Sequence, residues 1–424
     1  MTPALLLTLT LAADPPKLPE PFDTKSVVKH PKVIGWPADK TPKAPDGFTV
    51  SLYADGFDSP RWLHVLPNGD VLVAEARTLP PKKDDKPKSE EEKKKEEEKE
   101  KGMKESKTVT GGSANRITLL RDKDGDGKPE VRELFLENLS QPFGMALIGE
   151  HLFVANTDAV VRFPFKAGDT RITAKPTTIL HLPLGGYNNH WTRNLLASAD
   201  GKKLYVSVGS ASNVGEKGMK EEFLRACILE VNPDGTGLRE FAGGLRNPVG
   251  MAWEPTSKAL WTAVNERDEL GDELVPDYIT SVKDGGFYGW PYSYFGQTED
   301  PRRKGERPDL VAKALVPDLA VGSHTASLGL CFYTADKFPE RYRGGAFVGQ
   351  RGSWNRSEFA GYKVLFVPFK DGKPAGKPED FLTGFIANER EVYGRPVCTC
   401  VAPDGALLVT DDVTNRIWRV AAKK

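Results

Sequence analysis

The stretch “LPNGDVLVAEA” at residues 66–76 joins a turn to a run of alternating apolar residues, and this form returns along the whole chain. Pro, Asn, Gly and Asp favour tight turns, and an alternating apolar run predicts a strand that buries one face. The further copies are “LIGEHLFVANT” at 147–157, “SADGKKLYVSVG” at 198–209, “EPTSKALWTAVN” at 254–265, “YRGGAFVGQRG” at 342–352 and “APDGALLVTDD” at 402–412. A second strand pattern follows them, such as “NRITLLRD”, “AVVRFPFK”, “CILEVNPDG”, “YKVLFVPFK” or “NRIWRV”.

Six units at intervals of roughly 50 to 90 residues are typical of radial repetition, in which each unit buries its faces against its neighbours. The sequence therefore predicts an all-β fold, a six-bladed β-propeller over residues 47–424. The high contents of Gly (41) and Pro (33) agree with many turns between short strands. An array of β-sandwiches is the alternative, but it leaves the repeated turn-and-strand form unexplained.

The charge balance argues against one class of partner. Lys and Arg together number 59, and so do Asp and Glu, which gives a formal net charge of zero. A general nucleic-acid binder would carry an excess of basic residues, so we expect no nucleic-acid partner.

The first residues predict export. A short apolar run from Ala4 to Ala13 is followed by Asp-Pro-Pro, and the small residues Ala12 and Ala13 form a cleavage site. We therefore interpret residues 1–13 as a signal peptide, residues 14–46 as an N-terminal extension packed on the outside, and the protein as periplasmic or extracellular. The alternative is the unstructured start of a cytoplasmic chain. The run is too short to span a bilayer, so no membrane span is expected.

One segment interrupts the first blade. Residues 80–107, “PPKKDDKPKSEEEKKKEEEKEKGMKESK”, are almost wholly Lys and Glu. Such a segment has no apolar face to bury, so we predict a disordered insertion over 80–113, with at most a transient helix held by Glu–Lys pairs. A solvated insertion and an interaction arm are the two interpretations of its role.

An acidic loop could hold a structural calcium ion. In “DKDGDGKPEVRE” at 122–133, Asp122, Asp124, Asp126, Gly127 and Glu133 match the positions of an EF-hand calcium loop. The flanking segments are strand-like, whereas an EF-hand has helices. A hairpin turn without an ion is therefore the plainer interpretation, and a structural calcium site on the three aspartates is the alternative.

The stretch “GGYNNHWTRNLL” at 185–196 carries His190, one of only six histidines. The residue types leave three roles open: a catalytic base, a metal ligand, or a histidine that ties down its own loop. In a propeller, the loops that precede the innermost strands meet at one end of the central channel. Loops expected at that end carry “GGLRNPVGMAWEP” at 243–255, “VNERDELGDELVPDY” at 264–278, “AVGSHTASLGLCFY” at 320–333, “FVGQRGSWNRS” at 347–357 and “VYGRPVCTCVAPDG” at 392–405.

Taken in chain order, these motifs resemble the soluble quinoprotein sugar dehydrogenases, most closely the sorbosone-dehydrogenase-like branch. The resemblance runs from about Ala44 to Val420 and rests on “NNHWTRNL”, “GLRNPVGMAWEP”, “NERDELGDELVPDY”, “GGFYGWPY” and “GRPV…APDG”. That family has a six-bladed propeller that binds pyrroloquinoline quinone (PQQ) and Ca²⁺. The resemblance therefore implies the oxidation of an aldose or a related sugar.

The resemblance also implies the catalytic roles. His190 corresponds to the base that removes the proton from the sugar hydroxyl while hydride passes to the quinone, and a neutral histidine suits that task. Arg246 and Asn247 correspond to a pair that contacts the quinone oxygens. Asn189 and Arg193 are expected to orient His190 or the substrate.

The remaining implied residues hold the cofactors. Arg267 and Asp268 correspond to loop positions whose main-chain carbonyls bind calcium, which acts as a Lewis acid on the quinone. Arg395 corresponds to an arginine that faces the cofactor, and Arg351 falls near a cofactor-binding lysine. His324 falls near a hydroxyl residue that binds a carboxylate of PQQ. PQQ has three carboxylates, which arginines must compensate.

The sequence departs from the family at three places and leaves two other functions open. In the calcium loop, Arg267-Asp268 stands where Gly-Pro occurs in the sugar dehydrogenase branch. Val397 stands where a second arginine is expected, and Cys398 where a carboxylate is usual. The alternatives are a non-catalytic propeller that binds a glycan or protein, and a calcium-dependent lactonase. The chain has no Cys-x-x-Cys-His haem motif, so electrons would pass to a separate acceptor, a cytochrome or a quinone.

Overall fold

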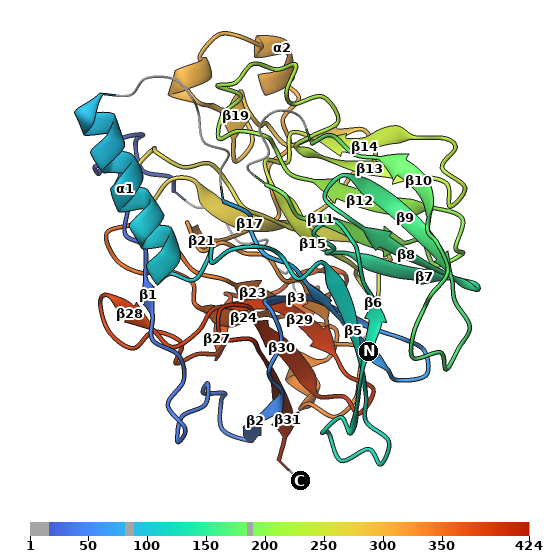
Figure 1. Ribbon diagram of the computed structural model, residues 1–424. Coiled ribbons are helices and arrows are strands. Elements are labelled where there is room, and N and C mark those ends of the chain that lie inside the picture. Colours follow the sequence, from blue (N-terminus) through green and yellow to red (C-terminus); the bar gives the residue numbers. More distant parts are fainter. Residues whose placement is uncertain (1–16, 81–88, 185–189, 424) are drawn as a thin grey trace, which may run out of the picture.

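A computed structural model describes residues 17–80, 89–184 and 190–423 of the chain. The predicted signal peptide and Asn189 lie outside these residues. Within them, six antiparallel sheets form the blades of a propeller, as the sequence predicted (Figure 1). The innermost strands contact one another in sequence, and β29 contacts β3, so the ring is closed.

The four strands of each blade follow one another in this order from the central channel outward. Blade 1 has β3 (Pro60–Val65), β4 (Val71–Glu75), β5 (Arg116–Arg121) and β6 (Val131–Leu136); blade 2 has β7 (Met145–Ile148), β8 (His151–Ala155), β9 (Ala159–Pro164) and β10 (Thr177–His181). Blade 3 has β11 (Arg193–Ala197), β12 (Leu204–Val208), β13 (Cys227–Val231) and β14 (Arg239–Gly243), with the short β18 (Gly286–Phe287) beside β14; blade 4 has β15 (Pro248–Trp253), β16 (Leu260–Val264), β17 (Pro276–Ser281) and β21 (Leu319–Ser323). Blade 5 has β22 (Cys331–Phe332), β23 (Ala346–Gln350), β24 (Lys363–Val367) and β27 (Glu379–Leu382); blade 6 has β29 (Pro396–Val401), β30 (Leu407–Asp411), β31 (Arg416–Ala422) and β2 (Phe48–Ala54).

The repeated form of the sequence is the second strand of each blade. In the first copy the amide of Leu66 donates to the carbonyl of Asp70 over 2.8 Å, which closes the turn before β4. Gly69 has φ +92° in that turn, a conformation that an L side chain rarely adopts. Every residue of β4 is buried, because a second strand is covered on both faces by neighbouring blades.

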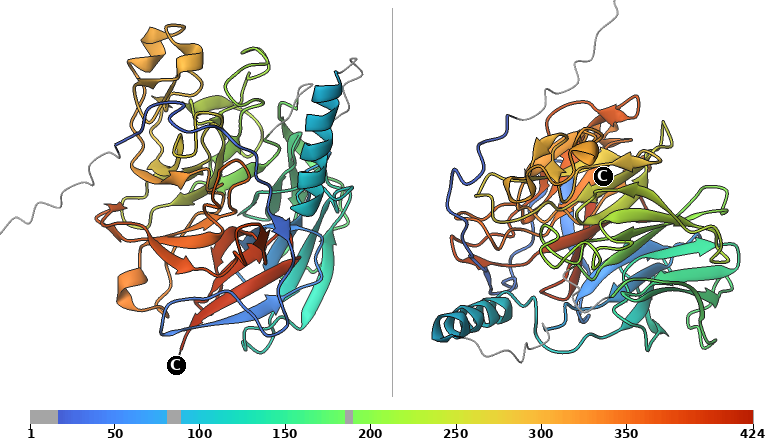
Figure 2. Two further views of the ribbon diagram at one scale, coloured as in Figure 1. Left: turned by 90° about the vertical axis from the view of Figure 1, so that its left-hand side faces the viewer. Right: turned by 90° about the horizontal axis from the view of Figure 1, so that it is seen from above.

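Blade 6 joins the two ends of the propeller. Strand β2 pairs antiparallel with β31, with Phe48 opposite Ala422 and Val50 opposite Val420 (Figure 2). The outermost strand of the last blade is therefore the first blade strand of the chain. This pairing fastens the ring by main-chain hydrogen bonds.

The N-terminal extension packs along blades 5 and 6. Its strand β1 (Lys32–Val33) pairs parallel with β28 (Glu391–Val392). Trp36 is buried, and its Nε1 donates to Asp411 Oδ2 over 2.8 Å. Residues 17–46 therefore lie against the propeller as a strap.

The Lys/Glu-rich insertion differs from the expected disorder. Residues Glu90–Glu105 form helix α1, which stands at the edge of the molecule (Figures 1 and 2). Its start has a capping box between Ser89 and Glu92, and Lys95 pairs with Glu91 at i,i+4 over 2.7 Å. The composition predicts disorder because the segment has no apolar face to bury. In the structure, the cap at the start of α1 and its ion pairs form a helix without a buried face.

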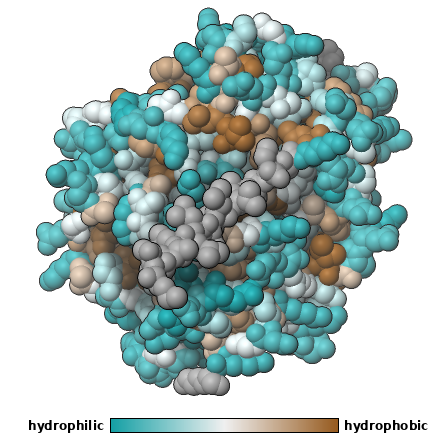
Figure 3. All heavy atoms as spheres, turned by 180° about the vertical axis from the view of Figure 1, so that it is seen from behind, coloured by the Kyte–Doolittle hydropathy of each residue, from teal (hydrophilic) through white to brown (hydrophobic). Residues whose placement is uncertain are grey.

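The other elements are short. They are β19 (Ser293–Tyr294), β20 (Thr298–Glu299), a 3₁₀ turn at Pro301–Arg303, α2 (Pro308–Val311), a 3₁₀ turn at Glu340–Tyr342, β25 (Phe369–Lys370) and β26 (Lys373–Pro374). Among the described residues, none of the helices has the length and apolar character needed to cross a membrane. The face in Figure 3 is mostly hydrophilic with separate hydrophobic patches. A cavity of about 450 Å³ is lined by residues of all six innermost strands.

Candidate active site

The sequence-predicted site residues lie at one end of the propeller. In an antiparallel blade, the start of the first strand and the end of the second lie at the same end. His190, Asn247 and Arg395 precede the innermost strands β11, β15 and β29. Arg351 follows β23, and His324 follows β21. Loops of blades 3, 4, 5 and 6 therefore contribute to this end.

His190 is held through one ring nitrogen. Its Nδ1 lies 2.9 Å from the main-chain oxygen of Ser210 and 3.1 Å from Ser210 Oγ. Because the main-chain oxygen can only accept, Nδ1 carries the proton and Nε2 is the acceptor nitrogen. Burial, and then the charge of Arg246, lower the pKa of His190 to about 3. The ring is therefore neutral at physiological pH and able to receive a proton.

Asn247 lies beside His190 across a glycine. A Cβ at Gly209 would overlap Asn247 Oδ1 and lie 2.6 Å from His190 Cβ, so only glycine allows this approach. Asn247 Oδ1 is buried without a hydrogen-bond partner in the described part of the chain. An unpaired buried amide oxygen is costly unless a ligand or water satisfies it, so this corner of the site is built for a polar group.

An ion pair joins the loop before β15, which carries Arg246, to the loop after β16, which carries Asp268. Arg246 Nη2 donates to Asp268 Oδ2 over 3.0 Å, and Asn355 Nδ2 donates to Asp268 Oδ1 over 2.7 Å. Burial alone would raise the pKa of Asp268, but the charge of Arg246 and the hydrogen bond and charge of His324 together outweigh it and hold the pKa below its usual range. His324 is 3.6 Å from this carboxylate, and its Nε2 lies 2.8 Å from the carbonyl of Gly271. Burial alone would lower the pKa of His324, but Asp268 raises it.

The predicted calcium ligands are partly engaged. The main-chain oxygen of Asp268 accepts from Arg302 Nη1 over 2.9 Å and from Asn213 Nδ2 over 3.2 Å. The Arg267 side chain is fully buried and donates to Glu266 Oε2 over 2.9 Å. A calcium ion could bind this carbonyl only after Arg302, the charged one of its two donors, has moved away from the oxygen.

Three arginines surround one carboxylate at the blade 5–6–1 junction. Arg351 Nε donates to Asp412 Oδ2 over 2.8 Å, and Arg61 donates to the same oxygen. Arg395 Nε donates to the main-chain oxygen of Arg351 over 2.9 Å. Burial lowers the pKa of Arg61 and of Arg395 to about 10, so both stay protonated at neutral pH. Positive charge exceeds negative charge among these side chains, which suits a ligand with carboxylates.

Sequence reasoning missed Arg61 and Gln141. Both are buried; Arg61 is in the innermost strand β3 and Gln141 is in the loop before β7. Arg61 lies over the ring of Trp191, next to His190, at 5.3 Å. A signal was present for Gln141, because a residue followed by Pro stands at or shortly before the start of four innermost strands. The copies are “SPRW” at 59–62, “QPFG” at 141–144, “NPVG” at 247–250 and “RPVC” at 395–398. Arg61 follows the Pro of its copy, so this pattern does not single it out.

Arg193 lies against the loop of His190, and orienting His190 is one of the two roles expected for it. Its side chain is fully buried and donates to the main-chain oxygens of His190 over 2.6 Å, Thr192 over 3.0 Å and Pro183 over 3.1 Å. These hydrogen bonds hold the loop of His190 in place. The other predicted substrate residue, Asn189, lies outside the described residues.

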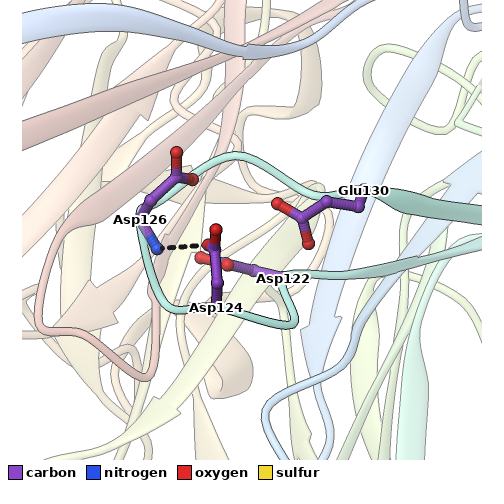
Figure 4. Close-up of side chains that lie close together, drawn as sticks. All are labelled: Asp122, Asp124, Asp126 and Glu130. Carbon is purple, nitrogen blue, oxygen red and sulfur yellow. Dashed lines mark hydrogen bonds between the residues drawn. The ribbon is translucent and has the colours of Figure 1, made fainter.

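The acidic loop lies at the opposite end of blade 1. Asp122, Asp124, Asp126 and Glu130 have oxygens within 4.8 Å of one another in the β5–β6 hairpin (Figure 4). The flanking strands agree with the sequence analysis. Glu133, the residue that the EF-hand pattern named, is exposed on β6 instead, and Glu130 joins the group.

Comparison with sequences of known proteins gives three relevant similarities. The family described as “Domain of unknown function (DUF7133)” matches residues 40–418. An uncharacterized protein of Borreliella burgdorferi is 32% identical over 245 residues, which cover 57% of this chain and 63% of that protein. The aldose sugar dehydrogenase YliI of Escherichia coli K12 is 33% identical over 275 residues, which cover 60% of this chain and 66% of that protein. The chain thus spans just under two thirds of each of these relatives.

Solved structures share the fold. The holo PQQ domain of pyranose dehydrogenase from Coprinopsis cinerea superposes with a TM-score of 0.70 at 18% identity, covering 92% of this chain and 98% of that one. A calcium structure of the AA12 carbohydrate-active enzyme of Trichoderma reesei gives 0.70 at 17% identity, covering 90% and 97%. The PQQ-bound aldose sugar dehydrogenase of Streptomyces coelicolor gives 0.56 at 18% identity, covering 89% and 99%. The resemblance to the soluble sugar dehydrogenases is confirmed, and the sorbosone-dehydrogenase-like branch stays a prediction.

Proposed function

Because the chain belongs to the family described as “Domain of unknown function (DUF7133)”, whose description assigns no activity, we propose its function from the site: PQQ-dependent oxidation of an aldose or a related sugar. The observation that carries the proposal is His190, which is neutral and offers Nε2 as a proton acceptor beside Asn247. The printed names of the relatives, aldose sugar dehydrogenase and pyranose dehydrogenase, support this class of substrate.

The residues fit PQQ by charge and by hydrogen bonding. The excess positive charge of Arg61, Arg351 and Arg395 would compensate the carboxylates, and the Asn247 amide would bind a quinone oxygen. When bound, PQQ supplies the acceptor for a hydride from the sugar carbon. His190 Nε2 takes the proton of the sugar hydroxyl, and Ser210 holds the imidazole in the tautomer that allows this. Electrons then leave to a separate acceptor, a cytochrome or a quinone.

Calcium is the second proposed cofactor, supported by the calcium structure of the Trichoderma reesei relative. Binding at the carbonyl of Asp268 requires Arg302 to release that oxygen. We expect Arg302→Met to lower the calcium concentration needed for half-maximal PQQ binding, because a competing cation is removed. An unchanged calcium dependence in this variant would argue against a calcium site at Asp268.

The deciding experiment is reconstitution. The apo protein is mixed with PQQ and Ca²⁺, desalted, and assayed with a dye acceptor and a panel of aldoses. We expect the desalted protein to retain the quinone absorbance and to reduce the dye. A desalted protein without quinone absorbance would contradict the proposal. Sugar binding without PQQ would instead favour the glycan-binding alternative.

The role of His190 is tested by substitution. His190→Ala should lower kcat by about 10²–10⁴-fold and leave PQQ bound, since a general base acts on the reacting proton. The matched control is His151→Ala, because His151 is exposed on β8. Unchanged turnover in His190→Ala would remove His190 from the mechanism.

Export is part of the proposal. We expect the mature protein to begin near Asp14 and to reside outside the cytoplasm. N-terminal sequencing of protein purified from its native host tests this. A retained Met1 would contradict export by a cleaved signal.

A further inference from the structure

The insertion of blade 1 lies at the same end of the propeller as the candidate active site. It joins the end of β4 to the start of β5, and His190 precedes β11 at that end. Sequence reasoning left its role open between a solvated loop and an interaction arm. Three contacts connect this region to site loops. One is at Thr78, just before the insertion, one is at Thr108, after α1, and one is made by α1 itself.

The first contact holds the loop of His190. Trp191 Nε1 donates to Thr78 Oγ1 over 2.9 Å. Trp191 is 6% exposed and directly follows His190, so its ring sets the position of the backbone that carries the histidine. The other side of this indole faces the guanidinium of Arg61 at 5.3 Å.

The second contact holds Arg395. Its Nη1 donates to Thr108 Oγ1 over 3.4 Å. Ser106 is fully buried, and its Oγ donates to the same Thr108 oxygen over 2.9 Å. The segment after α1 is thus packed against the site, although the helix itself is exposed.

The third contact joins α1 to the loop after β23. The backbone of Gly102 lies directly on the ring of His30, where a Cβ would overlap the imidazole. His30 in turn stacks on Trp354, with ring centroids 5.6 Å apart and an interplanar angle of 14°. Trp354 precedes Asn355, which donates to Asp268 Oδ1 over 2.7 Å. Gly102 of helix α1, His30 of the N-terminal extension and Trp354 of the site loop therefore pack on one another in this order.

From these contacts we propose that the insertion is a working part of the site, with Thr78 and Thr108 as positioning residues for the His190 loop and for Arg395, and with α1 docked through His30. The consequence for PQQ affinity rests on the proposed function; the positional claim does not.

Docking of α1 is tested by Gly102→Ala. In an undocked helix this change is stabilising, because Ala has the higher helix propensity. In a docked helix the new Cβ displaces His30, and we expect faster hydrogen exchange in peptides covering 190–197 and 392–398. Lys94→Ala is the matched control, because Lys94 is exposed on the same helix and its exchange pattern should equal that of the wild type. Unchanged exchange in Gly102→Ala would overturn the docking.

The anchors are tested by Thr78→Val and Thr108→Val, with Thr49→Val on β2 as the control for losing a similar hydroxyl away from the site. Thr78→Val should speed exchange in 190–197, and Thr108→Val in 392–398. For Thr108→Val we also expect about tenfold weaker PQQ binding with kcat at saturation unchanged, since Arg395 binds and does not react. Wild-type exchange in both variants would overturn the proposal. Failure of the wild type to bind PQQ would reject the proposed function and leave the exchange result to judge the positional claim.

Discussion

His190 differs from an ordinary loop histidine in what its environment does to its two nitrogens. Ser210 fixes the proton on Nδ1, while burial and the charge of Arg246 disfavour a second proton. A base that is already neutral needs no deprotonation before the reaction. The pH at which the ring becomes charged is therefore a direct test of its surroundings.

The acid side of the pH–rate profile follows from this shift. The pKa of His190 is lowered from 6.5 to about 3, so the fraction in the neutral form stays near one above pH 5. We expect kcat/KM measured between pH 5 and 8 to show no acid limb near pH 6.5. A limb with an apparent pKa near 6.5 that disappears in His190→Gln would contradict the assigned environment.

Gly209 is the tightest point between His190 and Asn247. Gly209→Ala should push both side chains apart and lower kcat/KM by at least about tenfold, since misplaced catalytic groups lose far more rate than stability. Gly112→Ala is the matched control, because a Cβ there meets nothing within 4 Å. Steady-state kinetics with thermal unfolding separates the outcomes: equal kinetics in both variants would show that the contact does not matter.

Single residues were the least predictable level. The motif around His190 predicted a special histidine, but the residue type of Arg193 could not reveal that its guanidinium caps three carbonyls of its own loop. Arg61 was missed because a lone arginine in a strand carries no pattern by itself. Its role depends on Asp412, which is distant in sequence and adjacent only in the closed ring.

At the level of elements, the β5–β6 hairpin is the feature with a separate function to test. Four carboxylates converge there, and main-chain amides bind several of them; the amides of Gly125 and Gly127 each donate to Asp122 over 2.8 Å. Such a turn is stable without an ion, and it also presents oxygens at calcium-like spacing.

A structural calcium ion at this hairpin should raise the thermal unfolding temperature. We expect Ca²⁺ to raise Tm in the wild type and in Glu133→Gln, because Glu133 lies on β6 away from the group. Asp124→Asn and Glu130→Gln should lose the increment. An equal calcium effect in all four proteins would place the ion elsewhere.

The sequence predicts a strand or helix best when the residues that determine it are adjacent in the chain. The second strands were found because a turn followed by alternation is written in adjacent residues. The innermost strand β22 (Cys331–Phe332) has only two residues, which are too few to form an alternating pattern. Helix α1 was predicted as disordered because composition describes burial, whereas its order comes from the cap at Ser89 and from ion pairs such as Lys95–Glu91.

At the level of the whole molecule, buried histidines couple stability to pH. Burial lowers the pKa of His64, and likewise that of His30, to about 4 from 6.5. Between these values the unfolded chain binds protons that the folded chain refuses, so stability is full above pH 6.5 and falls as the pH is lowered towards 4. Asp277 changes stability in the opposite sense. Burial raises its pKa to about 6, so its contribution to stability increases as the pH is lowered through that value.

His64 isolates this effect. We expect the free energy of unfolding in urea to fall less between pH 7.5 and 5.0 in His64→Gln than in the wild type. His181→Gln is the control, since His181 is exposed on β10. Parallel pH dependence in His64→Gln and the wild type would contradict the burial of a neutral His64.

The six-bladed architecture was predictable because the repeat is a property of the whole chain and survives errors in any one strand. The assignment of β2 to blade 6 was not predictable. The pattern of residues 48–54 predicts a strand, but it does not predict the sheet in which that strand pairs.

That assignment has a consequence for biogenesis. The ribosome makes β2 before any other blade strand and β31 after all of them, yet the two pair with each other. Until the final residues emerge, β2 presents an open edge and blade 6 lacks its outer strand. Under the proposed export, the ring can be completed only when both ends of the chain have arrived in the same compartment.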